Sequence, residues 1–313
     1  MKGLDAARAY WTEFGEPMLR EQFPDLLPLL AAGLTGAGSE CLGFDDDISR
    51  DHDFEPGFCL FLPNEDTLSR RDAFLLERAY TKLPRSFMGL ARGLTTPVGG
   101  PRRGVLRTEE YYNEKIGSQD GVLTVDQWLR LPEQALLEAV NGDIFFDGYG
   151  QVTRVRAGLS AYPEDVRRKR LAGCLLLMAQ SGQYNFSRCL SHGETGAAQL
   201  SAVQFAQNAM RAAFLLNGRY MPYYKWSLRA MRALPRLSLL AELVELLITT
   251  GTDGDMAREK QDVMESMAAD VIDELHAQSL TRAVCGDLEK HAYSVNDGIQ
   301  DAFVRNLHIL YAV

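Results

Sequence analysis

Apolar positions along the chain change their spacing at about residue 157, from short runs separated by turns to long helical stripes. The opening stretch already shows both kinds of pattern. Residues 4–22 carry apolar side chains at intervals of three and four, which predicts an amphipathic helix. These side chains are Leu4, Ala7, Trp11, Phe14 and Met18. A short apolar run at residues 31–35 follows and predicts the first strand.

The remainder of the first half alternates between strand-like and helix-like segments. Strands are expected at residues 51–62, 104–108 and 141–147, and helices at residues 65–83, 109–116 and 126–140. Pro56 and Gly57 interrupt the second strand. Because proline cannot donate a hydrogen bond to a ladder, a bulge or an edge position is predicted there.

The second half carries apolar stripes that are typical of packed helices. Helices are expected at residues 163–190, 197–217, 223–233, 236–249, 256–279 and 297–311. One stripe consists of Leu200, Val203, Met210 and Phe214, and another of Val263, Met267, Val271 and Leu275. The pattern predicts two domains, residues 1–157 with a sheet and residues 158–313 forming a helical bundle.

Composition narrows the class of protein. The chain has 313 residues, of which 46% are hydrophobic and 24% charged, as expected for a globular protein. Its formal net charge of −9 argues against a general nucleic-acid binder, although a local basic groove is compatible with it. The start of the chain lacks an apolar signal core, and residues 237–248 are too short to span a bilayer. We therefore expect a cytoplasmic protein with no membrane partner.

The five cysteines are odd in number and have no CxxC spacing, which favours reduced thiols over a disulfide or zinc framework.

A group of small and acidic residues near the first predicted strand offers the clearest chemistry. A turn containing Gly38 and Ser39 is followed by Asp51-His52-Asp53 and then by an apolar run. In an extended segment both aspartates share one face, about 7 Å apart, and can hold hard cations such as magnesium. The backbone N–H groups and hydroxyl of a Gly-Ser turn can hold a phosphate. Each feature is common alone, but their order predicts a site for a metal-chelated nucleoside triphosphate.

The same residues carry a family resemblance. Gly38, Ser39, Asp51 and Asp53 fall on the signature of the DNA polymerase beta-type nucleotidyltransferase superfamily, an apolar strand and Gly-Ser followed by Asp-X-Asp on the next strand. Further blocks resemble a stand-alone bacterial nucleotidyltransferase-like group of unknown function that is related to antibiotic adenylyltransferases. They are Gly38-Ser39-Glu40, Gly43-Phe44-Asp45, Ser49-Arg50-Asp51-His52-Asp53, Tyr162-Pro163-Glu164-Asp165-Val166 and Tyr223-Tyr224-Lys225-Trp226.

The resemblance implies an α+β fold, with an N-terminal nucleotidyltransferase-type mixed sheet flanked by helices and a C-terminal α-helical bundle. It implies magnesium-dependent transfer of a nucleoside monophosphate from a triphosphate, with ATP the expected donor, and release of pyrophosphate. The acceptor is an unknown small molecule or macromolecule, with nucleic acid disfavoured by the charge. Asp51 and Asp53 would hold two magnesium ions, and Gly38 and Ser39 the terminal phosphates.

The chain departs from the superfamily at a third carboxylate, which is expected on a strand near residues 104–108. Leu106 and Arg107 stand there instead. Glu109, Glu110 and Asp143 remain open as substitutes. The departure motivates an alternative function, a nucleotidyltransferase-like protein that binds nucleotide or a partner without turnover.

Two further segments are candidates for binding. Residues 219–226 concentrate aromatic and basic side chains, and two interpretations stay open: a packing plug between domains, or a site where Arg219 and Lys225 contact the triphosphate. Residues 91–104 are rich in glycine, proline and arginine. They are either a plain surface loop or a basic flap that supplies Arg92, Arg102 and Arg103 to the phosphates.

Overall fold

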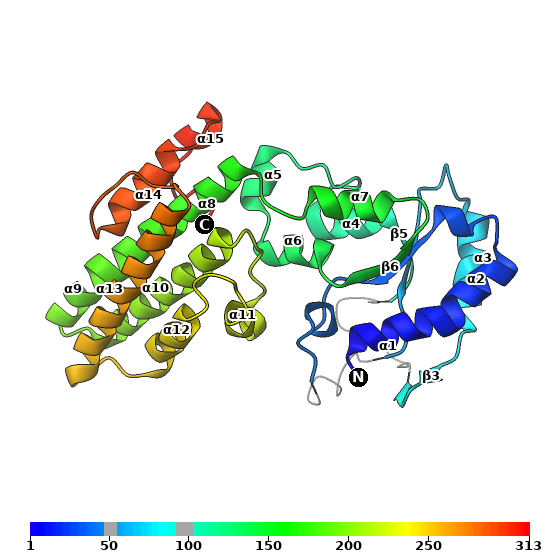
Figure 1. The fold of residues 1–313 in the computed structure, drawn as a ribbon, viewed down its shortest axis with the longest axis horizontal. Helices are drawn as coiled ribbons and strands as arrows, with labels where there is room; N and C mark the ends of the chain where they lie inside the picture. Colours follow the sequence, from blue (N-terminus) through cyan, green and yellow to red (C-terminus); the bar gives the residue numbers. More distant parts are fainter. Residues whose placement is uncertain (47–54, 92–102) are drawn as a thin grey trace. The chain divides into compact units, whose positions relative to one another are not determined.

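The computed structural model describes residues 1–46, 55–91 and 103–313, which divide into two compact units (Figure 1). The first unit comprises residues 1–123 and 135–160, and the second comprises residues 124–134 and 161–313. A four-stranded mixed sheet lies in the first unit and helices build the second, which confirms the predicted α+β class. The division at residue 157 stays a prediction.

The sheet has the strand order β5-β2-β1-β6. Its strands are β1 (Ala31–Leu34), β2 (Cys59–Leu62), β5 (Gly104–Arg107) and β6 (Asp143–Asp147). β1 runs antiparallel to β2 and β6, whereas β2 and β5 are parallel. Gly33 pairs with Cys59, Leu34 with Asp143, and Cys59 with Gly104. The last residue of β1 therefore lies on the same side of the sheet as the first residues of β2, β5 and β6. We call this side, where these strands begin or end, the turn edge.

Alternation along the strands sends side chains into two cores. Leu60 and Leu62 of β2 join a core with Tyr10 and Trp11 of the N-terminal helical run, whereas Phe61 packs on the opposite face. Helices cover both faces of the sheet (Figure 1). In this unit they are α1 (Gly3–Tyr10), α2 (Glu16–Gln22), α3 (Arg70–Thr81), α4 (Thr108–Ile116) and α7 (Gln151–Gly158), with a π-helical segment Trp11–Gly15 and short 3-10 helices Leu27–Leu29 and Glu40–Leu42. Strands β3 (Ser86–Phe87) and β4 (Leu90–Ala91) form a separate hairpin.

Several predicted boundaries were wrong for identifiable reasons. The helix expected from residue 65 begins at Arg70, because the Ser69 side chain accepts the N–H of Asp72 and caps it. The helix expected at residues 126–140 is broken at Pro132 into α5 (Val125–Arg130) and α6 (Glu133–Val140). The helix expected at residues 297–311 is reduced to α15 (Ala302–Asn306), and α14 (Leu288–Asp297), which precedes it, was not predicted.

The second unit is built around α10 (Thr195–Leu216). Around it lie α8 (Glu164–Met178), the π-helical segment Ala179–Asn185, α9 (Phe186–Ser191), α11 (Tyr224–Met231), α12 (Leu240–Thr249) and α13 (Gly254–Ala277). The stripe predicted on α10 was wrong at Leu200, which is 73% exposed. Its buried face consists largely of alanines. On α13 the predicted stripe is buried at Met267, Val271 and Leu275.

No helix in the described part of the chain combines the length and the apolar character that a membrane span requires. The five cysteines all lie in described segments, and each is a free thiol. Cys41, Cys59 and Cys174 are buried.

Candidate functional site

The turn that follows β1 is held open by a side-chain amide. Gly36 and Gly38 adopt φ values of +102° and +132°, which favour glycine. The Asn141 side chain accepts the Gly36 N–H at 2.8 Å and donates to the Gly36 carbonyl at 2.8 Å. Asn141 therefore replaces the backbone partner that a continued strand would have given Gly36.

A second layer supports Asn141. The Arg156 guanidinium donates to the Asn141 carbonyl at 2.8 Å and to the Thr35 hydroxyl at 3.3 Å. That hydroxyl lies 3.2 Å from Asn141 Oδ1. The turn is thus fixed by side chains from the loop before β6 and from α7, and it is pre-organised before any ligand arrives.

Gly38 allows a buried carboxylate to approach the turn. A Cβ atom on Gly38 would lie 2.6 Å from Glu40 Oε2, closer than real contacts permit. Glu40 is 4% exposed, and its Oε1 lies 3.3 Å from Nη2 of Arg103, a residue that comes just before β5. Gly38, Glu40 and Arg103 therefore form one tightly packed group at the turn edge.

The predicted phosphate-binding residues face the outside of this group. Ala37, Gly38 and Ser39 are partly exposed, whereas the flanking Gly36 and Glu40 are buried. Within the described segments, the N–H groups of Gly38 and Ser39 and the Ser39 hydroxyl have no hydrogen-bond acceptor. Such a row of unused donors can bind an anion.

The predicted metal ligands are only partly covered by the structure. Asp51 and Asp53 lie outside the described residues, as do Arg92 and Arg102. Within the described segments, no group of three or more His, Cys, Asp or Glu side chains is placed to hold a metal ion. The prediction that Arg103 belongs to a basic flap was wrong, because its side chain is 6% exposed and paired with Glu40.

The topology discriminates among the substitutes for the third carboxylate. Asp143 is the first residue of β6 and lies at the turn edge, where Arg8 forms an ion pair with it. Glu109 and Glu110 follow the end of β5, at the opposite edge of the sheet. Of the three, only Asp143 shares an edge with Gly38 and Ser39.

Two residues of this site escaped sequence reasoning. Glu40 directly follows Gly38 and Ser39, but adjacency alone does not reveal that its carboxylate turns back on Gly38. Asn141 belongs to an Asn-Gly pair, which indicates that the chain turns at Asn141 itself. The pair does not indicate that the Asn141 side chain hydrogen-bonds to the turn after β1. A Cβ on the following Gly142 would lie 1.9 Å from the Leu34 carbonyl oxygen, so the two segments touch through backbone.

The other predicted phosphate ligands, Arg219 and Lys225, belong to the second unit. Both side chains are exposed. The Arg219 N–H donates to the Phe214 carbonyl and closes the end of α10, and Lys225 Nζ lies 5.1 Å from the centre of the Trp226 ring. Their part in triphosphate binding stays a prediction.

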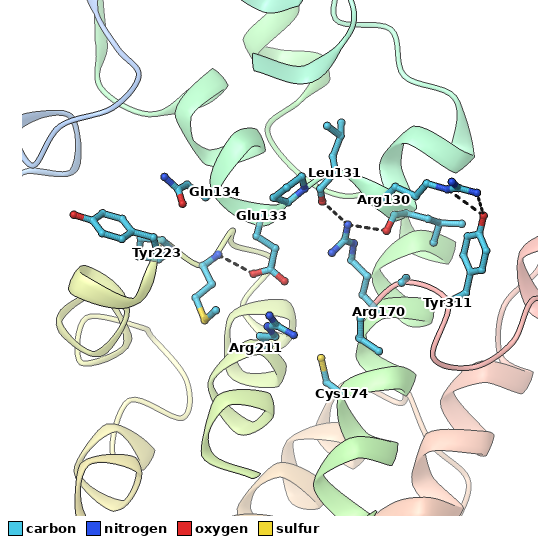
Figure 2. Close-up of a pocket in the computed structure, with 15 residues that line it drawn as sticks. Arg130, Leu131, Glu133, Gln134, Arg170, Cys174, Arg211, Tyr223 and Tyr311 are labelled. Carbon is cyan, nitrogen blue, oxygen red and sulfur yellow. Dashed lines mark hydrogen bonds between the residues drawn. The ribbon is translucent and has the colours of Figure 1, made fainter. Parts of the chain in front are cut away.

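The segment around these two residues borders a pocket of about 430 Å³ in the second unit (Figure 2). Met221, Pro222 and Tyr223 form one wall. The broken connection between α5 and α6 forms another, and Arg170 of α8 and Arg211 of α10 supply charge. The remaining lining residues are Leu129, Arg130, Leu131, Pro132, Glu133, Gln134, Cys174, Tyr311, Ala312 and Val313.

Comparison with known families finds a family model that matches part of the chain, across residues of both units. Residues 128–227, less than half of the chain, match the family described as "Domain of unknown function (DUF4037)". The matched range contains every pocket residue except Tyr311, Ala312 and Val313. No curated protein matches the chain.

Among solved structures, the chain is similar to a nucleotidyltransferase-like protein from Exiguobacterium sibiricum 255-15. The two are 13% identical, and the likeness covers 90% of this chain and 80% of that one, with a TM-score of 0.37.

Proposed function

We propose that this protein is a metal-dependent nucleotidyltransferase that moves a nucleoside monophosphate from a nucleoside triphosphate to an acceptor and releases pyrophosphate. The observation that carries the proposal is the turn edge. A braced turn with unused N–H donors leaves β1 there, beside the start of β2. Asp51 and Asp53 precede the first residue of β2 by eight and six positions along the chain.

The residues divide the chemistry in a simple way. Gly38 and Ser39 would bind the terminal phosphates, because backbone donors pre-organised in a turn stabilise negative charge without reorganisation. Asp51 and Asp53 would hold magnesium, whose charge neutralises the phosphates and aligns the acceptor for in-line attack. Asp143, at the same edge of the sheet, is the proposed third carboxylate.

The test compares nucleotide binding with and without the two aspartates. We expect calorimetric titration of the wild type with ATP, GTP, CTP and UTP in magnesium to show saturable binding, strongest for ATP. Asp51→Asn/Asp53→Asn should weaken that binding by at least about tenfold, the equivalent of one charge-assisted contact. Asp66→Asn, an exposed acid of the same unit, is the matched control and should bind as the wild type does. Equal binding by all three proteins would refute the proposal.

The alternative function is nucleotide binding without turnover. One observation on β5, the strand that was expected to carry the third carboxylate, favours it. β5 ends in Leu106 and Arg107, and the Arg107 guanidinium donates to the Pro63 carbonyl at 2.5 Å, at the edge opposite the turn. A pyrophosphate-release assay over a panel of acceptors separates the two functions. Release that depends on Asp51 and Asp53 supports transfer, and nucleotide binding without release across the panel supports the alternative.

A further inference from the structure

The pocket of the second unit contains a buried guanidinium that is only partly used. Arg170 is 7% exposed. Its Nη2 donates to the Trp128 carbonyl at 3.1 Å and to the Leu129 and Leu131 carbonyls at 2.9 and 2.6 Å, the last two within the pocket lining (Figure 2). Its Nε is also buried and has no hydrogen-bond partner. Among the described residues no carboxylate lies within ion-pair distance of Arg170, and its charge is stabilised by these carbonyls and by the Tyr162 ring, whose centre lies 5.1 Å from the Arg170 Cζ.

A second guanidinium faces the same space. Arg211 of α10 lines the pocket and is half-buried. Across the described segments it forms neither a hydrogen bond nor an ion pair. Arg130 also lines the pocket, but its guanidinium is already paired with Asp126 and Tyr311. Two cations, Arg170 and Arg211, therefore remain to interact with a ligand.

One carboxylate, that of Glu133, lines the pocket together with these two guanidiniums. Glu133 begins α6 and accepts the Met221 N–H at 3.2 Å through Oε2, and its other oxygen has no donor within the described residues (Figure 2). Burial raises the pKa of Glu133, and the charges of Arg170 and Arg211 oppose that rise. With two guanidiniums against one carboxylate, the pocket is short of negative charge.

Buried or half-buried guanidiniums without a paired anion are costly, and an anionic ligand that pairs with them recovers part of that cost. A guanidinium fork matches the oxygen geometry of phosphate and carboxylate groups, and a cavity of this volume lies in the range for small-molecule sites. The unused oxygen of Glu133 is an acceptor for a hydroxyl or an amine. Pro132, Pro222 and Tyr223 provide apolar wall between these polar points.

We propose that this pocket binds a small organic phosphate, with the phosphate on Arg170 and Arg211 and a hydroxyl or amine of the ligand on Glu133. Its residues belong to the second unit, so this binding does not depend on Asp51 or Asp53 of the first unit.

The experiment uses three probes that separate the two halves of the recognition. Phosphoethanolamine carries phosphate and amine, inorganic phosphate carries only the anion, and ethanolamine carries only the donor. Each is titrated calorimetrically into the full-length protein without magnesium. We expect phosphoethanolamine to bind saturably and at least about tenfold more tightly than inorganic phosphate, as one charged hydrogen bond allows. Ethanolamine should not bind.

Variants assign the two contacts. Arg211→Gln should weaken both phosphate probes by about tenfold or more, and Arg211→Lys should give an intermediate loss because lysine keeps the charge without the fork. Glu133→Gln should abolish the preference for phosphoethanolamine and strengthen inorganic phosphate, since a negative charge is removed. Arg188→Gln, an exposed arginine of the same unit, is the control.

Two outcomes overturn this proposal. One is the absence of saturable binding by either phosphate probe, and the other is wild-type affinity in folded Arg211→Gln. A thermal melt establishes that each variant is folded. Asp51→Asn/Asp53→Asn should bind phosphoethanolamine normally, so that failure here and failure of the proposed nucleotidyl transfer are distinguishable.

Discussion

Replacing Gly38 by alanine probes the packing of the candidate phosphate-binding turn most directly. Two effects add at this position. A φ of +132° lies in a region that is almost reserved for glycine, and placing alanine there costs about 1–3 kcal/mol. The new Cβ would also stand 2.6–2.7 Å from the three terminal atoms of Glu40, so the carboxylate must move.

The second effect is worth more because Glu40 is buried and paired. Its contact with Arg103, at 3.3 Å, joins two side chains that are each 6% exposed. Displacing a hydrogen bond to a charged group costs about 1.5–3 kcal/mol. We therefore expect Gly38→Ala to lower the free energy of unfolding of the first unit by about 3–4 kcal/mol, the sum of modest values from both ranges.

Gly43→Ala is the matched control in the same loop. Gly43 also has a positive φ, +71°, but no atom lies within 4 Å of its added Cβ. Only the backbone term applies, so the expected loss is about 1–2 kcal/mol. In a Glu40→Ala background the steric term disappears, and Gly38→Ala should then cost about 1.5 kcal/mol less than in the wild type.

The assay is urea denaturation followed by the fluorescence of Trp11. All variants carry Trp128→Phe and Trp226→Phe, so that only the first unit reports. The reasoning is refuted if Gly38→Ala costs no more than Gly43→Ala, or if its cost is unchanged when Glu40 is alanine.

Three further results are expected. Asn141→Ala should lower the unfolding free energy of the first unit by about 1–3 kcal/mol, because the Gly36 N–H and carbonyl lose their partner; denaturation with the same reporter checks it, and an unchanged midpoint contradicts it. Lys260 is fully buried with Nζ on the Leu247 and Thr250 carbonyls, and burial lowers its pKa below the ordinary 10.5. Between the lowered pKa and 10.5, Lys260 is protonated in the unfolded chain and largely neutral in the folded one. The unfolded state therefore binds more protons, and the free energy of unfolding should rise as pH increases through this range. Melting temperatures across that range should show this slope in the wild type and a smaller one in Lys260→Met. Burial raises the pKa of Cys59 to about 11, so a thiol reagent at pH near 8 should label the exposed Cys285 quickly and Cys59 only after unfolding, as peptide mass spectrometry would show.

Local patterns were sufficient to predict most elements of the fold. Strand β1 and the helical run before it follow from apolar spacing, and β6 from its apolar centre. The face of α10 could not be predicted in this way. Hydropathy favours Leu200, but tight packing between helices selects small residues, and Ala202, Ala206 and Ala209 are buried instead. Which side of a helix faces its neighbours depends on the neighbours as well as on the helix.

The candidate site shows the same limit. Gly38 and Ser39 stand out because they are local in sequence. Glu40, Arg103 and Asn141 come together only through the sheet register, which pairs Cys59 with Gly104 and Leu34 with Asp143. Spacing in a single sequence does not contain that register. It also could not select Asp143 over Glu109, because the choice depends on which end of a strand each residue occupies.

The passage of residues 124–134 into the second unit, between two segments of the first, has a consequence for how the protein is made. As the chain leaves the ribosome, α5 emerges before α8, whose Arg170 holds the α5 carbonyls. The first unit meanwhile needs residues 135–160 to complete its sheet. Trp128 and Leu129 are buried in the folded protein, but during synthesis they remain exposed until α8 has been made. In an N-terminal fragment that ends at residue 157, the side chains of Trp128 and Leu129 would stay exposed, because α8 is missing. No single cut of the chain therefore yields two complete units.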